Sequence, residues 1–163
     1  LRNLLYTAQL PLQQPIAIRY PRGRCNDTNW KDQPFETIAI GKGEQIKKGT
    51  EIAIITIGAL TDTVLKCIEA TKNASRYALY DARFVKPLDE ELLHNIFSCY
   101  QRVISVEEGV GKGGFGSALA EFACANGYTT PLEIVALPDT FIGVSSSDYM
   151  SNLILSHLRD SLF

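Results

Sequence analysis

Residues 52–57, Ile-Ala-Ile-Ile-Thr-Ile, constrain the fold more than any other part of the sequence. A strand with one face in water alternates apolar and polar residues, whereas a strand covered on both faces is apolar almost without interruption. Such strands are typical of sheets that have helices packed on both sides. The run therefore predicts an α/β fold in which residues 52–57 form a doubly covered strand.

Strand and helix patterns alternate after this run. Strands are expected at 77–81, 102–106 and 132–137, and helices at 61–72, 89–100, 115–126 and 148–162. This alternation implies βαβ units with right-handed crossovers and a mainly parallel sheet. An earlier strand at 38–40 would lie at an edge and could be antiparallel. We therefore predict a three-layer α/β fold with a mainly parallel sheet of about five strands.

The first 40 residues have a different pattern. The apolar residues of 1–8 fall at helical spacing without an N-cap before them, as at the end of a helix that began earlier. A short β-rich run follows at 16–20, and residues 24–34 are polar and irregular, as in a linker. The chain begins with Leu1 rather than Met, so we expect it to be a fragment of a longer protein.

Composition excludes several classes of function. Of the 163 residues, 45% are hydrophobic and 21% charged, and the net charge is −2, so neither nucleic acid nor an anionic membrane is an expected partner. The four cysteines form no CxxC pair and there are only two histidines, so we expect no metal site and cysteines that are free and mostly buried. No apolar run of about 18 residues and no signal peptide is visible, so no membrane span is expected, and free cysteines favour a cytoplasmic protein.

The loop at 109–114, Gly-Val-Gly-Lys-Gly-Gly, matches the GxGxxG pattern of dinucleotide-binding folds. It follows a predicted strand and precedes a predicted helix, and Asp139 comes later in the chain. However, the strand is not the first of the sheet, and Glu107 and Glu108 would repel a pyrophosphate. We favour the alternative that the glycines permit a tight turn and close packing.

Two other motifs contain charged residues at defined positions. In Tyr20-Pro21-Arg22-Gly23 a rigid turn holds Arg22, whose guanidinium suits phosphate; the alternative is a solvated or salt-bridged arginine. In the segment 81–89, Asp81 and Arg83 follow a strand, where α/β sheets place functional groups, but a structural ion pair is the favoured alternative.

No catalytic set follows from the residues alone. Glu107 and Glu108 could form an acid–base pair, but neighbours on a strand point to opposite sides. Residues alone predict an α/β domain that binds or assembles.

Several segments, in chain order, resemble the 1-deoxy-D-xylulose-5-phosphate synthase family of transketolase-like thiamine diphosphate enzymes. They are 16–23 with its YPRG motif, 81–90 with RFVKPLDEE, 106–108 with 113–117, and 137–142. Transketolases and the beta subunits of 2-oxo-acid decarboxylases share the glycine loop more loosely and usually lack YPRG. Residues 143–147 depart from the glycine-containing loop common in the family.

The resemblance implies an organisation and an activity. Residues 1–24 would be a remnant of the preceding pyrimidine-binding domain, 25–40 a linker and first strand, and 41–163 the C-terminal transketolase-like domain. The full-length enzyme would condense pyruvate with glyceraldehyde 3-phosphate to 1-deoxy-D-xylulose 5-phosphate with loss of CO2. It would be a homodimer with thiamine diphosphate and magnesium held by upstream motifs, and this chain alone would be inactive.

Only one site residue follows from the resemblance. By the YPRG motif, Arg22 would bind the phosphate of glyceraldehyde 3-phosphate. No catalytic, cofactor or metal residue is expected here, and Arg83, Glu107 and Glu108 would be structural or interface groups. The alternatives are another thiamine diphosphate enzyme (a transketolase or a 2-oxo-acid decarboxylase beta subunit), a non-enzymatic assembly module and a dinucleotide-binding domain.

Overall fold

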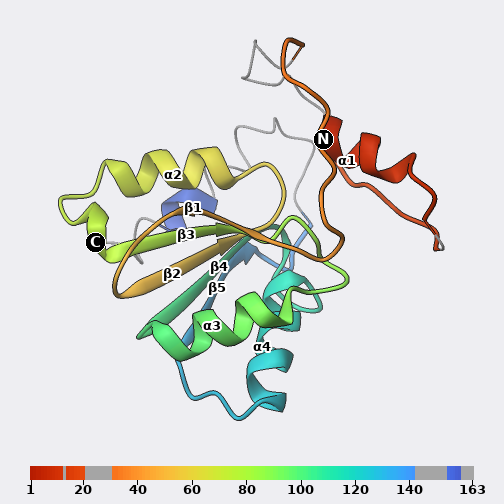
Figure 1. Ribbon diagram of the computed structural model, residues 1–163. Coiled ribbons are helices and arrows are strands. Elements are labelled where there is room, and N and C mark those ends of the chain that lie inside the picture. Colours follow the sequence, from red (N-terminus) through yellow and green to blue (C-terminus); the bar gives the residue numbers. More distant parts are fainter. Residues whose placement is uncertain (13, 21–30, 142–153, 159–163) are drawn as a thin grey trace. The chain divides into compact units, whose positions relative to one another are not determined.

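The computed structural model describes residues 1–12, 14–20, 31–141 and 154–158 (Figure 1). The chain divides into two compact units, Leu1–Ile40 and Gly41–Phe163. No helix in these ranges is long and apolar enough to cross a membrane.

The second unit contains a five-stranded sheet with the order β1-β3-β2-β4-β5. The strands are β1 (Glu44–Lys47), β2 (Ile52–Thr56), β3 (Tyr77–Asp81), β4 (Arg102–Val110) and β5 (Leu132–Leu137). All neighbouring pairs are parallel except β1 and β3, which are antiparallel. The predicted mainly parallel sheet with an antiparallel edge is confirmed.

Helices cover both faces of this sheet and complete three layers (Figure 1). On one face lie α2 (Thr61–Glu69) and the helical residues 154–158, and on the other lie α3 (Glu90–Cys99) and α4 (Phe115–Ala125). A short 3-10 helix, η1 (Ala74–Arg76), precedes β3. Every residue of β2 is buried, with Ile52 and Ile54 in one core and Ala53 and Ile55 in the other. This double coverage explains the apolar run.

The predicted strand at 38–40 is wrong. These residues are in no strand, and the edge strand is β1, a few residues later. The Ile38 N–H donates to Thr7 Oγ1 of α1, so its hydrogen bond is made within the first unit and not with the sheet. The turn at Gly41, where φ is +72°, separates this segment from β1.

Three other expectations are revised, and a fourth is tested only in part. Residues 16–20 are not in a strand, because no neighbouring strand pairs with them in the described part of the chain. The strand predicted at 102–106 extends to Val110 through an irregularity in its pairing with β5 after Val106. Of the predicted helix 148–162, residues 154–158 are helical and the others lie outside the described residues. Cys67, Cys99 and Cys124 are free as expected, but the last two are exposed.

The first unit is organised around α1 (Arg2–Ala8). Phe35 stacks on Tyr6 with ring centroids 5.1 Å apart, and the Arg2 guanidinium lies 3.8 Å from the centre of the Phe35 ring. Together with the bond from Ile38 to Thr7, these contacts fix the end of the predicted linker on the helix.

Candidate functional site at the carboxyl edge of the sheet

The carboxyl ends of β2, β3 and β4 meet at one edge of the sheet, where open α/β folds place functional groups. The chain leaves β2 for α2 on one face and leaves β4 for α4 on the opposite face. Three polar residues lie near this edge: Thr56 and Asp81 end β2 and β3, and Glu107 lies in β4 directly after Val106, which is opposite Thr56. We therefore take this edge as the candidate site.

Glu107 binds the N-terminus of α4. Its side chain is buried, at 4% exposure, and its two carboxylate oxygens accept hydrogen bonds from the backbone N–H groups of Phe115 (2.9 Å) and Gly116 (2.8 Å). A helix N-terminus carries unpaired N–H groups and a partial positive charge, and a carboxylate satisfies both. Glu107 thus occupies the place where a nucleotide-binding helix would hold a phosphate.

Close packing requires a glycine at the end of the loop, at Gly114, and in the first turn of α4, at Gly116. A Cβ atom on Gly114 would lie 2.3 Å from the Val110 carbonyl oxygen, and one on Gly116 would lie 2.6 Å from Ile134 Cγ2. Neither approach is possible for a side chain. The prediction that the loop glycines serve close packing is supported at Gly114, and a dinucleotide would have to compete with the Glu107 carboxylate.

The rest of the loop is held by local bonds. Ser117 Oγ accepts a hydrogen bond from the Gly113 N–H at 3.0 Å and donates one to the Gly111 carbonyl at 2.6 Å. Asp139 lies in the loop after β5, and its carboxylate is 3.6 Å from the Lys112 ammonium with both side chains largely exposed. Asp139 therefore contacts the loop lysine and not the end of a strand, where a ribose-binding acid would lie.

Asp81 and Arg83 contribute to the structure in different ways. Asp81 Oδ1 accepts a hydrogen bond from the Arg83 N–H at 2.9 Å, and this turn places Arg83 at a φ of +57°. The Arg83 guanidinium forms an ion pair with Glu44 on β1. Burial raises the pKa of Asp81, and the bond from Arg83 only partly opposes this. The predicted ion pair between Asp81 and Arg83 is not found: Asp81 contacts the Arg83 backbone N–H, and the Arg83 guanidinium pairs with Glu44 instead.

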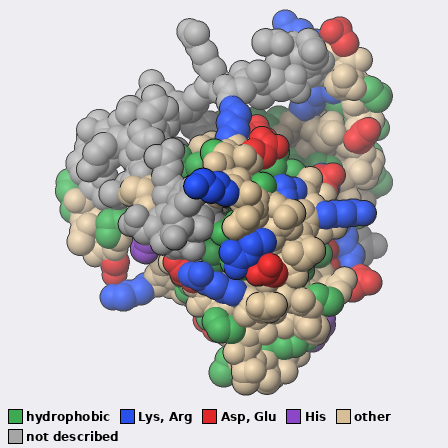
Figure 2. Space-filling view, turned by 90° about the vertical axis from the view of Figure 1, so that its left-hand side faces the viewer, with side chains coloured by type: hydrophobic (Ala, Val, Ile, Leu, Met, Phe, Trp, Pro, Cys, Tyr) green, Lys and Arg blue, Asp and Glu red, His purple; other side chains and the backbone are tan. Residues whose placement is uncertain are grey.

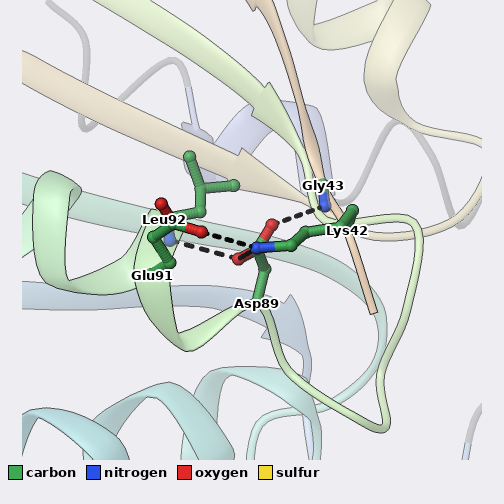
Figure 3. A network of polar contacts seen from close by, with 5 residues as sticks. All are labelled: Lys42, Gly43, Asp89, Glu91 and Leu92. Atoms are coloured by element: carbon green, nitrogen blue, oxygen red, sulfur yellow. Dashed lines mark hydrogen bonds and ion pairs between the residues drawn. The ribbon is translucent and has the colours of Figure 1, made fainter. Parts of the chain in front are cut away.

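Asp89 joins two segments that are far apart in sequence (Figure 3). Its Oδ1 accepts from the Leu92 N–H at 3.2 Å and from the Lys42 ammonium at 3.1 Å, and its Oδ2 accepts from the Gly43 N–H at 3.0 Å. Burial alone would raise the pKa of Asp89, but the bonds from Leu92, Gly43 and Lys42 lower it. Lys42 also contacts the exposed Glu91 at 2.8 Å.

Sequence reasoning placed Asp89 in the first turn of a helix and missed this second role. The available signal was an aspartate directly before two glutamates at the predicted start of the helix, which is typical of an N-cap. The bond to Gly43 depends on tertiary structure and leaves no local pattern.

The remaining polar group at the edge is also engaged within the protein. Thr56 Oγ1 donates to the Tyr80 carbonyl at 3.0 Å and lies 2.8 Å from Thr61 Oγ1. In the ranges that the structure covers, no three His, Cys, Asp or Glu side chains are grouped so that they could hold a metal ion. The edge therefore has the character of a stabilised framework.

The face in Figure 2 carries Lys and Arg side chains interspersed with Asp and Glu. At the amino ends of the strands, Arg76 before β3 contacts Glu51 before β2 at 2.9 Å, and Arg102 at the start of β4 contacts Glu133 in β5. Mixed charge of this kind produces no field of a single sign that would attract a polyanion.

Arg22, the predicted phosphate-binding residue, lies outside the described residues. Its role therefore stays a prediction. The neighbouring Tyr20 is 67% exposed.

The chain is similar to known proteins over most of its length. The family model of the transketolase C-terminal domain matches residues 41–156. The 1-deoxy-D-xylulose-5-phosphate synthase of Bacteroides fragilis is 43% identical over 155 residues, covering 94% of this chain and 24% of that protein. The protein of the same name from Parabacteroides distasonis is 46% identical over 143 residues, covering 87% of this chain and 22% of that protein. The chain thus spans about a quarter of the length of these relatives.

A solved structure with a similar fold is a split-gene transketolase described as an inactive beta4 tetramer. It has a TM-score of 0.64 and 26% sequence identity, covering 80% of this chain and 44% of that one.

Proposed function

Because this chain belongs to the transketolase C-terminal domain family, we propose that it is the C-terminal part of a 1-deoxy-D-xylulose-5-phosphate synthase. The longer enzyme condenses pyruvate with glyceraldehyde 3-phosphate and releases CO2. The observation that supports this best is the identity of 43% and 46% to two synthases of that name over most of this chain. The chain alone is inactive in this proposal, because the chemistry belongs to a cofactor bound elsewhere.

Arg22 contributes the phosphate contact in this proposal. The guanidinium is a planar donor that can bond two phosphate oxygens together, and Pro21 and Gly23 on either side favour a rigid turn. Holding the phosphate fixes the acceptor aldehyde relative to the reacting carbon. Arg22 would therefore act on binding and orientation of one substrate and not on proton transfer.

Thiamine diphosphate and magnesium are assigned to other parts of the longer enzyme. Thiamine diphosphate supplies the electron sink for decarboxylation. The described residues do not fit it, since the α4 N-terminus that could take a diphosphate is capped by the Glu107 carboxylate. No catalytic step is therefore assigned to residues of this chain.

The two compact units support a domain assignment. We assign residues 1–24 to the end of the preceding domain, 25–40 to a linker and 41–163 to the C-terminal domain. The boundary after Ile40 coincides with the start of the matched family region at residue 41. By the same resemblance, the longer enzyme is a homodimer that works in the cytoplasm.

The test compares Arg22→Ala with Arg24→Ala in the longer enzyme. Arg22→Ala should raise the KM for glyceraldehyde 3-phosphate roughly 30- to 150-fold, because losing a charged phosphate contact costs about 2–3 kcal/mol. The KM for pyruvate should stay within about twofold. Arg24→Ala removes the same charge outside the YPRG motif and should leave both constants near wild type. Equal changes for both substrates would show that Arg22 is misassigned.

The likeness to a split-gene transketolase favours a second candidate, a sister thiamine diphosphate enzyme with a different donor or acceptor. A transketolase would transfer a two-carbon unit from a ketose phosphate without releasing CO2. An assay of CO2 release from pyruvate separates the two candidates. Release that depends on added glyceraldehyde 3-phosphate supports the synthase, and no release supports a transketolase.

A further inference from the structure

The first residues of the second unit are packed against the segment that leads into α3. Gly41 directly follows the boundary at Ile40. A Cβ atom on Gly41 would lie 2.8 Å from Pro87 Cγ, and one on Gly43 would lie 2.7 Å from Leu92 Cδ2. The Cβ atom on Gly43 would also lie 3.0 Å from the Asp81 carbonyl oxygen, so glycine favours the close approach at both positions, and Gly41 also has a φ of +72°.

Asp89 closes this contact with both carboxylate oxygens. Oδ1 accepts from the Leu92 N–H within α3, whereas Oδ2 accepts from the Gly43 N–H, 46 residues earlier in the chain. Lys42 adds an ion pair to the same carboxylate (Figure 3). We call Lys42, Gly43, Asp89 and Leu92 the Asp89 clamp.

A simple helix cap would need only one of these oxygens. Serine caps helices about as well as aspartate does, because one side-chain oxygen is enough to accept from the first turn. In the Asp89 clamp the second oxygen is used entirely by the junction, and the Asp89 side chain is only 10% exposed. Asp89 therefore has a second function besides capping α3, which is to hold the backbone at Gly43.

We propose that Asp89 is a positioning residue, which fixes the point where the chain passes from residues 1–40 into the α/β domain. Without the clamp, Gly41–Gly43 would add free residues to the linker, since glycines restrict the backbone least. A longer free linker would lower the fraction of time that the segment carrying Arg22 spends in its productive position. This last step rests on the proposed function.

Three variants separate the clamp from the cap. Asp89→Ser keeps an oxygen that can cap α3 but is too short to reach Gly43. Asp89→Asn keeps the shape but has only one oxygen for two backbone N–H groups. Glu91→Gln is the matched control, since it removes the exposed partner of Lys42 and leaves the bonds of Asp89 intact.

The first readout is hydrogen exchange of the Gly43 amide in the 163-residue chain. Exchange should become about tenfold faster in Asp89→Ser and Asp89→Asn, while amides in β2 keep their wild-type protection and Glu91→Gln resembles the wild type. Unchanged Gly43 exchange in both Asp89 variants would overturn the proposal.

The second readout is kinetic and uses the longer enzyme. Asp89→Ser should raise the KM for glyceraldehyde 3-phosphate by about three- to tenfold, with kcat and the KM for pyruvate within about twofold. Faster Gly43 exchange with unchanged KM would remove the positioning role. If the wild type forms no 1-deoxy-D-xylulose 5-phosphate, the proposed function is wrong. The Gly43 amide exchange would in that case still show whether the Asp89 clamp exists.

Discussion

The substitution Glu107→Gln tests whether the Glu107 carboxylate caps α4, because it replaces one of the two accepting oxygens by an NH2 group. In the wild type both carboxylate oxygens accept backbone N–H groups, at 2.9 and 2.8 Å, in a side chain that is 4% exposed. Glutamine has one oxygen, so its NH2 group must face the second N–H and leave it unpaired. A lost bond to a charged group costs about 1.5–3 kcal/mol, and losing the charge at a helix N-terminus adds up to about 2 kcal/mol.

We therefore expect Glu107→Gln to lower the free energy of unfolding by about 2–4 kcal/mol. Urea unfolding followed by circular dichroism would measure it, with an unchanged m-value showing that the surface exposed on unfolding is the same. Glu121→Gln removes the same charge from an exposed position on α4 and should stay within about 0.5 kcal/mol of the wild type.

A rescue experiment identifies the cause. Glu107→Ala leaves space beside the α4 N-terminus, where a small anion could bind the freed N–H groups. Formate should restore more stability to Glu107→Ala than to the wild type, compared with chloride at equal ionic strength. A loss below about 1 kcal/mol in Glu107→Gln, or no selective rescue, would refute the reasoning.

Three further outcomes follow from the packing and charges. Gly49→Ala should destabilise the chain by at least about 3 kcal/mol in urea unfolding, because the new Cβ would lie 2.1 Å from the Tyr77 carbonyl carbon. The lowered pKa of Asp89 gives stability that is present above its unfolded pKa of about 3.9 and is lost as pH falls through the lower folded value, so Asp89→Asn should flatten unfolding free energies measured below pH 4. The pKa of Asp81 is raised, so its contribution to stability depends on pH in the opposite way. That contribution is present below the unfolded pKa and is lost as pH rises through the folded value. Asp81→Asn, which can still accept the Arg83 N–H, should therefore be more stable than the wild type at pH 7 in the same pH series.

The elements predicted most accurately are those whose patterns are local. The apolar run predicted β2 correctly, because a strand covered on both faces is apolar throughout. The acidic residues after Pro87 predicted the start of α3. The short apolar runs at 16–20 and 38–40 share the β-propensity of real strands. Propensity alone could not show that they have no partner in the described part of the sheet.

The candidate site was predictable in outline only. The residues flagged at the strand ends do lie at the carboxyl edge, but their partners depend on tertiary structure. Arg83 meets Glu44 because β1 runs antiparallel to β3, which places Glu44 opposite Asp81. Glu107 was expected to repel an external phosphate; its actual role as a cap follows from the turn that brings α4 back onto the end of β4. The assignment of Arg22 as a phosphate-binding residue rests on the resemblance to the synthase family.

The measurement that tests the central proposal most directly is product formation by the longer enzyme with thiamine diphosphate and magnesium present. Carboxyl-labelled pyruvate should release labelled CO2 and yield 1-deoxy-D-xylulose 5-phosphate in equal amounts, and both should require glyceraldehyde 3-phosphate. An enzyme shown to bind the cofactor that forms no such product, but transfers a two-carbon unit from a ketose phosphate, would contradict the assignment.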